Sequence, residues 1–272
     1  MRVALATTLP LPEVDADQDL MLEAFRRAGF ECELLGWDSG DDPNEWDAVI
    51  LRSTWNYHLK PDEFLNWTRS VDRLFNDAAT VESNVDKRYL VGLEDCGVAT
   101  VPTVFCDQAA SVQAIADEQG WTKFVVKPSV GASSYGTGLF DSGDPSAQAW
   151  FDNLLGSGTV MIQPFVESVN EGGERALVWI DGEFTHKIVK QPRFSDDEES
   201  VSQAEELTAP ELEIGHKALE GFSDLLYARV DVMELDGKPV VSELELVEPS
   251  LYFRQNPAAL DRMVEAVAQR LS

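Results

Sequence analysis

The chain has 272 residues, with apolar and charged fractions of 44% and 26%, which describe an ordinary globular protein able to bury a substantial core in one large or a few small domains. Its 49 acidic and 21 basic residues give a formal net charge of −28, so nucleic acid and anionic membranes are poor partners. No long apolar run is present and the start runs into acidic residues, so we expect neither a membrane span nor a signal peptide.

Basic residues are scarce, and lysine is scarcer than arginine. This acid excess indicates either a halophilic source, where salt screens the self-repulsion, or simply an acidic mesophilic protein. The three cysteines, Cys32, Cys96 and Cys106, form no CxxC motif. Their number and spacing favour a reduced, cytoplasmic protein in which they are small buried hydrophobic residues.

The first part of the chain alternates strands and helices. We predict strands at residues 3–7, 31–35 and 48–52, and helices at 18–28, before Gly29, and 64–75. This rhythm predicts a small open parallel sheet, whose binding groups gather at the carboxyl ends of the strands. Residues 52–57 lie at such an end.

The middle of the chain continues with mixed elements. Predicted helices run from about 83 to 96 and over 111–120, and residues 97–103 form loop and strand. A strand at 124–128 precedes a small-residue loop at 129–138, and Pro164 interrupts a strand at 160–166.

The last part of the chain predicts two hairpins. Asp181-Gly182 joins strands at 175–180 and 183–190, and Asp236-Gly237 joins strands at 228–234 and 240–246. Between the hairpins we expect a mobile acidic loop at 194–209 and an amphipathic helix at 211–226; a helix at 257–271 closes the chain.

Lys127 is the first candidate for chemistry, because a lysine inside an apolar strand is costly unless it meets an anion. The loop that follows could close its backbone N–H groups over phosphate oxygens. It is not a P-loop, since the lysine precedes the glycines. A surface hairpin is the alternative interpretation of this loop.

Glu243 and Glu245 form the second candidate. Strand geometry puts both carboxylates on one face, where they repel each other unless a cation joins them. Oxygen ligands suit Mg²⁺, and Asp231 on the preceding strand could supply a third. The alternative is a solvated strand face of an acidic protein.

In order along the chain, these motifs resemble the ATP-grasp superfamily, in its glutathione-synthetase and RimK-like branch. The resemblance covers roughly residues 81 to 255. It rests on Asn84-x-x-Lys87, Lys127 with its loop, the segment 161–166, Gly173-Glu174-Arg175, Lys190, Asp231, the Glu-x-Glu strand, and Glu248-Pro249.

The resemblance implies a fold and a domain plan. The fold would be α/β: an N-terminal open parallel α/β domain at 1–80, a central segment at 81–110, a small α+β lid at 111–165, and a C-terminal catalytic subdomain with an antiparallel sheet at 166–272.

It also implies residue roles. Lys87 and Lys127 would contact the α- and β-phosphates of ATP, and Arg175 would stabilise the transferring phosphate, with Lys190 as a second catalytic residue. The remaining nucleotide contacts would come from the loop residues Ser133, Ser134 and Gly136, from Gln163 at the adenine amine, from Phe165 and Val166 at the ring, and from Glu174 or Glu171 at the ribose.

The implied metal site consists of Asp231, Glu243 and Glu245, holding two Mg²⁺ ions. The family commonly has asparagine at the position of Glu245, so the extra charge here could tighten metal binding or shift the preference toward Mn²⁺.

The N-terminal motif at 52–57, together with 248–253, resembles the subgroup of cycloserine-forming (O-ureido-serine) cyclo-ligases. That resemblance implies a small amino-acid-like substrate, with Arg52 as a carboxylate clamp and Trp55 and Tyr57 as walls. The alternative is that the two aromatic residues pack a domain joint and that Arg52 is buried in an ion pair.

The implied reaction is ATP-dependent carboxylate–amine ligation: phosphorylation of a small carboxylate to an acyl phosphate, which an amine attacks, with ring closure as one form. The absence of a nucleophilic triad in the sequence fits this mechanism. A regulatory or degenerate nucleotide-binding protein is the alternative. The expected partners are small molecules, and the protein would be a monomer or a homodimer.

Overall fold

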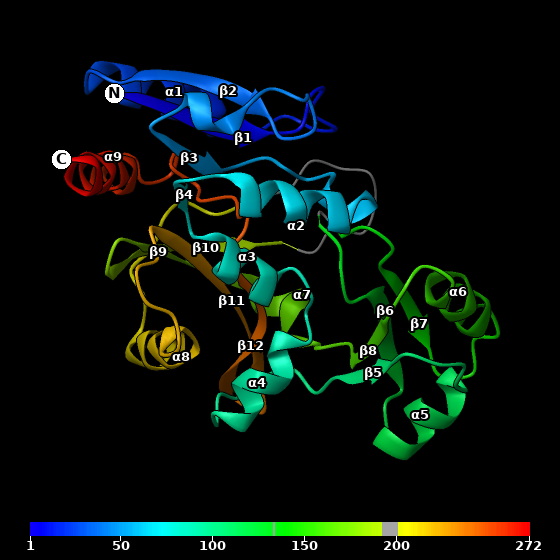
Figure 1. The fold of residues 1–272 in the computed structure, drawn as a ribbon. Helices are drawn as coiled ribbons and strands as arrows, with labels where there is room; N and C mark the ends of the chain where they lie inside the picture. Colours follow the sequence, from blue (N-terminus) through cyan, green and yellow to red (C-terminus); the bar gives the residue numbers. More distant parts are fainter. Residues whose placement is uncertain (133, 192–200) are drawn as a thin grey trace.

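Three four-stranded sheets form the frame of the molecule (Figure 1). The structure is a computed structural model that describes residues 1–132, 134–191 and 201–272. One sheet is parallel and two are antiparallel, which confirms the predicted α/β architecture with an open N-terminal sheet, a small lid and a C-terminal antiparallel sheet. None of the described helices is long and apolar enough to cross a membrane.

The N-terminal sheet has the strand order β2-β1-β3-β4 and is parallel throughout. Its strands are β1 (Arg2–Thr7), β2 (Glu31–Gly36), β3 (Ala48–Leu51) and β4 (Leu74–Phe75). Between and after them run α1 (Gln18–Arg27), the short turns η1 (Pro43–Glu45) and η2 (Tyr57–Leu59), α2 (Pro61–Ser70) and α3 (Ala78–Asn84). Because β3 is buried along its whole length, the chain emerging from it enters the interior of the molecule.

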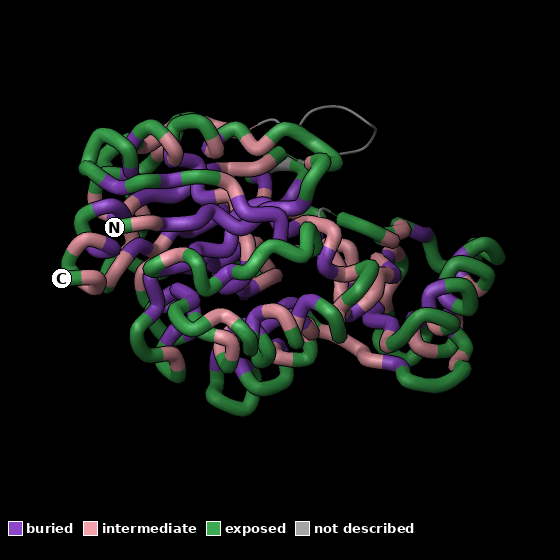
Figure 2. The backbone as a smooth tube through the Cα atoms, turned by 45° about the horizontal axis from the view of Figure 1, so that its top comes forward, coloured by how far each residue is buried: buried purple, intermediate pink, exposed green. Residues whose placement is uncertain are grey.

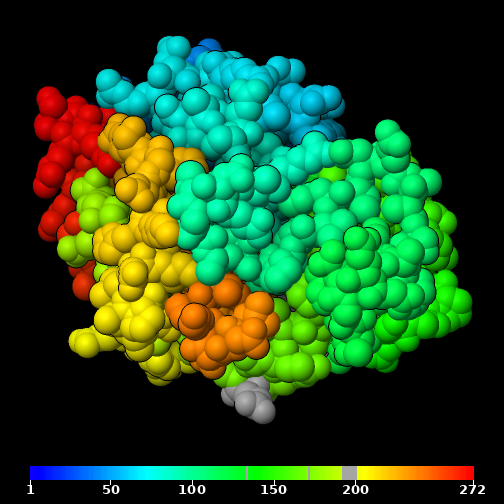
Figure 3. Space-filling model, turned by 90° about the horizontal axis from the view of Figure 1, so that it is seen from below, coloured from blue at the N-terminus to red at the C-terminus, as the bar shows by residue number. Residues whose placement is uncertain are grey.

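The lid is a separate lobe built on a second sheet of order β5-β8-β6-β7. Its strands are β5 (Val104–Cys106), β6 (Lys123–Pro128), β7 (Gly138–Asp141) and β8 (Val160–Pro164), and its helices are α5 (Val112–Gln119) and α6 (Ser146–Leu155). Phe124 and Val126 alternate with Val125 and Lys127, and they pack with Phe151 in the lid's own core. Seen from below, the lid bulges beside the residues of the central segment (Figure 3).

The C-terminal sheet has the order β10-β9-β11-β12. Its strands are β9 (Glu174–Ile180), β10 (Glu183–Lys190), β11 (Tyr227–Leu235) and β12 (Lys238–Glu245). The helices around it are α4 (Tyr89–Asp95), α7 (Ser168–Gly172), α8 (Ala209–Leu219) and α9 (Pro257–Leu271). Both predicted hairpins are confirmed, with Asp181 and Asp236 at positive φ in their turns.

A shared core joins the N-terminal and C-terminal sheets. Residues of β1, α1, β9 and α9 pack in one hydrophobic cluster, and buried positions concentrate along the strands of these two sheets (Figure 2). Asn76 ties the sheets by donating to the carbonyls of Tyr227 (2.7 Å) and Leu246 (2.8 Å). The phenol of Tyr227 in turn donates to the carbonyl of Val247 (2.9 Å). The two sheets therefore share one core, whereas the lid has a core of its own.

Several predicted boundaries were wrong. The helix expected at 64–75 begins at Pro61 and ends at Ser70, and β4 follows it. The helix expected from 83 to 96 is α4, and a separate helix, α3, ends at Asn84. The helix expected at 211–226 ends at Leu219, because the next residues lead into β11. Strands β5 and β7 and helices α6 and α7 were not predicted, since short elements carry little periodicity of their own.

The segment expected as a mobile loop is only partly described, since residues 194–200 lie outside the described ranges. The described part pairs with β10 through bridges from Val201 to Lys190 and from Glu205 to Lys187. These residues therefore extend the sheet rather than leave it.

A buried ion pair holds α8 against the back of the C-terminal sheet. Lys187 Nζ donates to both carboxylate oxygens of Glu211 (2.9 and 3.1 Å), and both side chains are almost fully buried. Removal of one partner leaves a buried charge, so Lys187→Ala should lower the free energy of unfolding by about 3 kcal/mol. Urea titration of Arg27→Ala is the matched control, because its exposed pair with Asp261 should contribute less than about 0.5 kcal/mol. Equal urea midpoints for Lys187→Ala and Arg27→Ala would contradict a stabilising role of the buried pair.

Candidate active site

A cavity of about 920 Å³ opens where the lid, the C-terminal sheet and the N-terminal domain meet. Its walls come from β6 and the following loop, from β11 and β12, and from residues 13–17, Trp55 and Tyr57. A volume of this size accommodates a nucleotide together with a small second molecule. The three lobes thus share one binding site.

The lid wall carries Lys127. Strand alternation turns Val125 and Lys127 toward the cavity, while Phe124 and Val126 face the lid core. Lys127 Nζ lies 2.7 Å from Glu243 Oε1, across the cavity from the lid. The lysine predicted to be out of place in an apolar strand is therefore half of an interdomain ion pair.

Lys87 reaches the same carboxylate from the central segment. Its Nζ donates to the carbonyl of Gly131 (2.8 Å) and lies 3.9 Å from Glu243. Asn84, three residues earlier, accepts from the N–H of Leu246 and donates to the carbonyl of Leu244. In the Asn-x-x-Lys motif, Asn84 thus binds the end of β12 and Lys87 binds the small-residue loop.

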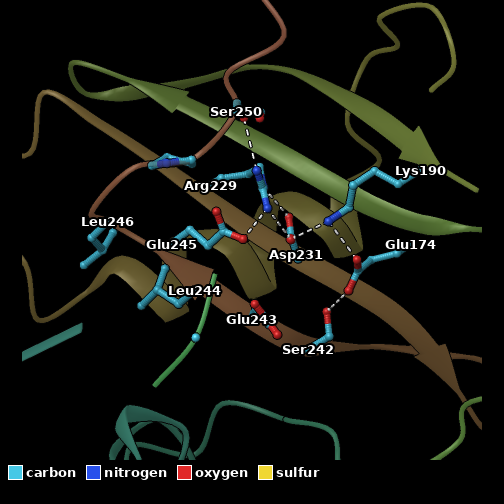
Figure 4. A network of polar contacts seen from close by, with 12 residues as sticks. Glu174, Lys190, Arg229, Asp231, Ser242, Glu243, Leu244, Glu245, Leu246 and Ser250 are labelled. Carbon is cyan, nitrogen blue, oxygen red and sulfur yellow. Dashed lines mark hydrogen bonds and ion pairs between the residues drawn. The ribbon is translucent and has the colours of Figure 1, made fainter. Parts of the chain in front are cut away.

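The floor of the cavity is the acidic face of β11 and β12 (Figure 4). Asp231 lies directly opposite Glu243 in the register, and Arg229 lies opposite Glu245. Arg229 binds Asp231 through two nitrogens (2.8 and 2.9 Å) and also pairs with Glu245. Its guanidinium therefore bridges two of the three carboxylates.

A third cation, Lys190, completes this network from β10. Its Nζ lies 2.6 Å from Asp231 Oδ2 and 2.7 Å from Glu174 Oε2, and Glu174 in turn accepts from Ser242. Figure 4 shows Lys190 and Arg229 approaching Asp231 from opposite sides. Asp231 is thus held by two cations and is 1% exposed.

The carboxylates differ in charge because their partners differ. Burial raises the pKa of Asp231 and Glu243, but the neighbouring cations outweigh burial and hold both values below the usual range. Burial raises the pKa of Glu245 to about 7, since Arg229 only partly offsets burial and the neighbouring acids. The neighbouring cations therefore favour the ionised form more strongly at Glu243 than at Glu245.

The opposite end of the cavity suits a nucleotide base. Gln163 is buried, lines the cavity and donates its amide to Thr103 Oγ1 (2.8 Å). The amide oxygen of Gln163 stays available to accept from an exocyclic amine. Phe165 and Val166 line the same end, and Lys123 lies over the Phe165 ring at 4.4 Å.

The N-terminal wall consists of aromatic side chains. Trp55 and Tyr57 both line the cavity, and Tyr57 also stacks on Phe64 (5.0 Å) within the domain core. Arg52 is 3% exposed and does not line the cavity; it donates to the carbonyl of Pro249 (2.9 Å). Arg52 is therefore buried, as in the alternative, but its partner is a backbone carbonyl, and no ion pair joins it within the described ranges.

Most of the predicted site residues meet at this cavity. The lining includes Trp55, Tyr57, Lys87, Lys127, Ser134, Gln163, Phe165, Val166, Glu174, Lys190, Asp231, Glu243 and Glu245. Gly136, at positive φ, belongs to the loop without lining the cavity. Ser133 and the side chain of Glu171 lie outside the described part of the chain.

Arg175 is placed away from the cavity. Its side chain is directed to the side of α8, where Nε lies 3.2 Å from Glu211, and it also lies 3.9 Å from Glu234. Adjacent strand residues face opposite sides of a sheet, so Glu174 and Arg175 cannot both face the cavity. The arginines that do line it are Arg229 and Arg254, and of these Arg229 lies on the acidic floor.

Within the described ranges, no three side chains of metal-binding type are arranged as a ready-made metal site. Asp231, Glu243 and Glu245 instead each pair with a basic side chain. Their oxygen-only donor set still fits Mg²⁺ rather than a softer metal. The side chain of Asp231 is 2% exposed, whereas those of Glu243 and Glu245 are 23% and 28% exposed, so an ion in the cavity can reach the two glutamates more directly.

Arg229, Tyr89 and Glu248 also line the cavity, although no role was predicted for them from the sequence. A signal for Arg229 was present, because it stands two residues before Asp231 and so shares its face. Glu248 belonged to a motif of the resemblance but had no predicted role, and Tyr89 carried no signal. Their positions depend on the packing of α4 and of the loop after β12.

Both a family model and a curated relative match this chain. Residues 3–76 match the family model for the N-terminal domain of D-cycloserine synthetase DcsG. The chain is 31% identical to the cycloserine biosynthesis protein DcsG of Streptomyces lavendulae, over 99% of this chain and 98% of that protein.

Solved structures show the same relationship. The crystal structure of D-cycloserine synthetase DcsG superposes with a TM-score of 0.90 at 30% identity and covers the whole of both chains. A RimK-domain ATP-grasp protein from Sphaerobacter thermophilus superposes with a TM-score of 0.73 at 19% identity, covering 98% of this chain and 100% of that one. The second likeness shows the ATP-grasp fold.

Proposed function

The chain belongs to the family of the D-cycloserine synthetase DcsG, and on that basis we propose that it is an ATP-dependent carboxylate–amine ligase. It would phosphorylate a small amino-acid-like carboxylate, form a C–N bond by attack of an amine, and release ADP and phosphate. Ring closure is the form of this reaction that fits the family. The single observation that carries the proposal is the cavity in which Lys127, Arg229 and Glu243 converge from two lobes.

The nucleotide would span the lid and the acidic floor. Gln163 and the Phe165–Val166 backbone would hold the base, and Glu174 the ribose. Lys87 and Lys127 would bind phosphate oxygens, giving up their present contacts with Gly131 and Glu243. Binding would thus replace an ion pair between the lobes by a shared ligand.

Mg²⁺ would be held by Glu243 and Glu245, with Asp231 behind them, and when bound it would neutralise phosphate charge. The same oxygen donors would hold two ions, and the extra charge of Glu245 would shift the preference toward Mn²⁺. Arg229 and Lys190 would stabilise the charge that develops on the phosphoryl group and on the substrate carboxylate. Positioning and charge neutralisation suffice for this chemistry, so no side-chain nucleophile is needed.

An ADP-release screen tests the proposal. Amino acids and O-substituted serines are added to the protein with Mg-ATP, at low and at molar salt. We expect one of them to stimulate ADP release, with a cyclic or amide product in the mass spectrum. Saturable Mg-ATP binding without stimulation across the panel would instead favour the regulatory nucleotide-binding alternative.

The phosphate role of Lys127 has its own test. Lys127→Ala should raise the Kd for Mg-ATP about 100-fold, because a charge-assisted contact of about 2–3 kcal/mol is lost. Isothermal titration measures it. Lys123→Ala is the matched control on the same strand, and its Kd should change less than about threefold, because Lys123 lies outside the cavity lining. Unchanged affinity in Lys127→Ala would exclude the phosphate role.

A further inference from the structure

Glu248 is an acidic side chain of the cavity that the proposed reaction leaves without a role. It follows the end of β12 by three residues and lies in the loop that closes the C-terminal side of the cavity. Its carboxylate forms no ion pair within the described ranges, and its own backbone N–H is the hydrogen-bond donor that acts on it. The carboxylate thus faces the cavity without a cationic partner there.

The other acids of the cavity floor differ from Glu248 in this respect. Glu174, Asp231, Glu243 and Glu245 each contact a lysine or an arginine at hydrogen-bond distance. Asp17, at the N-terminal side, accepts from the backbone N–H groups of two residues of the closing loop. Asp15, on the same N-terminal side, accepts from the backbone N–H of Asp17. Of the acids named here, Glu248 is therefore the one with neither a basic partner nor a hydrogen bond from another residue within the described ranges.

The charge around Glu248 favours a cation from outside the protein. Burial raises its pKa to about 8, Glu245 adds to the rise, and Lys87 and Arg229 only partly offset it. A ligand cation beside the carboxylate would stabilise its ionised form. The nearby phenol of Tyr57 has a raised pKa, first through burial and next through Glu248, and it supplies no positive charge.

The walls indicate which kind of cation fits. Trp55 and Tyr57 line the cavity, and aromatic faces attract organic ammonium groups. A magnesium ion prefers several oxygen ligands and bound water, which the acidic floor provides better than this wall. Arg229 lies close enough to Glu248 to lower its pKa. An amino acid whose carboxylate contacts Arg229 would therefore bring its ammonium group within reach of Glu248.

We propose that the carboxylate of Glu248 binds the ammonium group of the amino-acid substrate. This contact would make the enzyme prefer the amino acid to the corresponding carboxylic acid that lacks the amino group. This assignment rests on the proposed function and adds to it the residue that recognises the nitrogen. Arg229 would receive the carboxylate end, and Trp55 would cover the ammonium.

The test compares two ligands that differ only in the ammonium group. O-ureido-serine and its des-amino counterpart, 3-(ureidooxy)propanoic acid, are titrated into protein saturated with Mg²⁺ and a non-hydrolysable ATP analogue. Wild type should bind the amino acid about 100-fold more tightly, and Glu248→Gln should lose about 30-fold or more of that preference. Its Kd for the des-amino ligand should stay within about twofold.

Two variants sharpen the comparison. Glu248→Asp keeps the negative charge on a side chain one methylene shorter, so it should keep part of the preference for the amino acid over the des-amino ligand. Glu33→Gln, an exposed position of β2, removes the same charge elsewhere and should leave both Kd values unchanged. The Kd of the ATP analogue checks that each variant is folded.

Equal weakening of both ligands in Glu248→Gln would overturn the assignment, because a structural defect has no reason to sense the ammonium. Wild type that binds neither ligand, or both equally, would overturn it as well. Failure of the ligase proposal gives a different result. In that case the wild-type protein releases no ADP, but the ratio of its Kd values for the two ligands still shows whether Glu248 recognises the ammonium group.

Discussion

Arg229→Lys is expected to lower the kcat of amino-acid-stimulated ADP release about 10²–10³-fold, with little change in the Kd for Mg-ATP. The lysine keeps one positive charge, but it cannot bridge Asp231 and Glu245 and still present N–H donors to the transferring group. Steady-state rates and nucleotide titration measure the two quantities separately.

Arg175→Lys is the matched control. The same substitution lies on the neighbouring strand β9, but it faces Glu211 and α8 instead of the cavity. Its kcat should stay within about threefold of wild type, since a retained charge beside Glu211 preserves most of the pairing. If Arg175→Lys lost activity and Arg229→Lys did not, the arginine expected from the sequence would regain its role.

Glu243→Gln is expected to reduce kcat/KM for Mg-ATP about 10³-fold, the second large effect. Glu243 is the one carboxylate that Lys127 and Lys87 both approach, and these cations keep its pKa below the usual range. The amide keeps the shape but loses the charge that would hold Mg²⁺. ADP release measured across a magnesium titration should therefore show a much higher half-saturating concentration.

Glu245→Asn is the informative comparison, because it removes the charge of the second carboxylate and keeps an oxygen ligand. Burial raises the pKa of Glu245 to about 7, so its charge is the less firmly held of the pair. We expect a loss of no more than about tenfold in kcat/KM, with magnesium still supporting turnover. Equal losses in the two variants would mean that the two carboxylates act as one ligand set.

Local sequence patterns were sufficient wherever a side chain's direction follows from strand alternation. Lys127 on β6 and Glu243 with Glu245 on β12 face the cavity, as the period of two predicts. The Asp-Gly turns fixed both hairpins, because only a few residues adopt positive φ readily. Short strands such as β4 were missed, since their formation depends on pairing with β3 rather than on their own residues.

Neither Arg175 nor Arg52 could be placed from the sequence. Alternation states that neighbouring residues face opposite sides of a sheet, but it does not say which side α8 covers and which side the lid faces. Arg52 meets its partner, the carbonyl of Pro249, 197 positions away along the chain. Contacts between residues so far apart in the sequence depend on how the N-terminal sheet packs against the C-terminal sheet.

The sequence by itself thus determined the fold class, the order of the motifs and the set of charged residues available for a phosphate and a metal. The tertiary structure decided which arginine reaches them and which acid is left for the substrate. The physical reason is that backbone periodicity is a local property, whereas burial and charge pairing at Arg229 and Glu248 depend on three lobes meeting at one cavity.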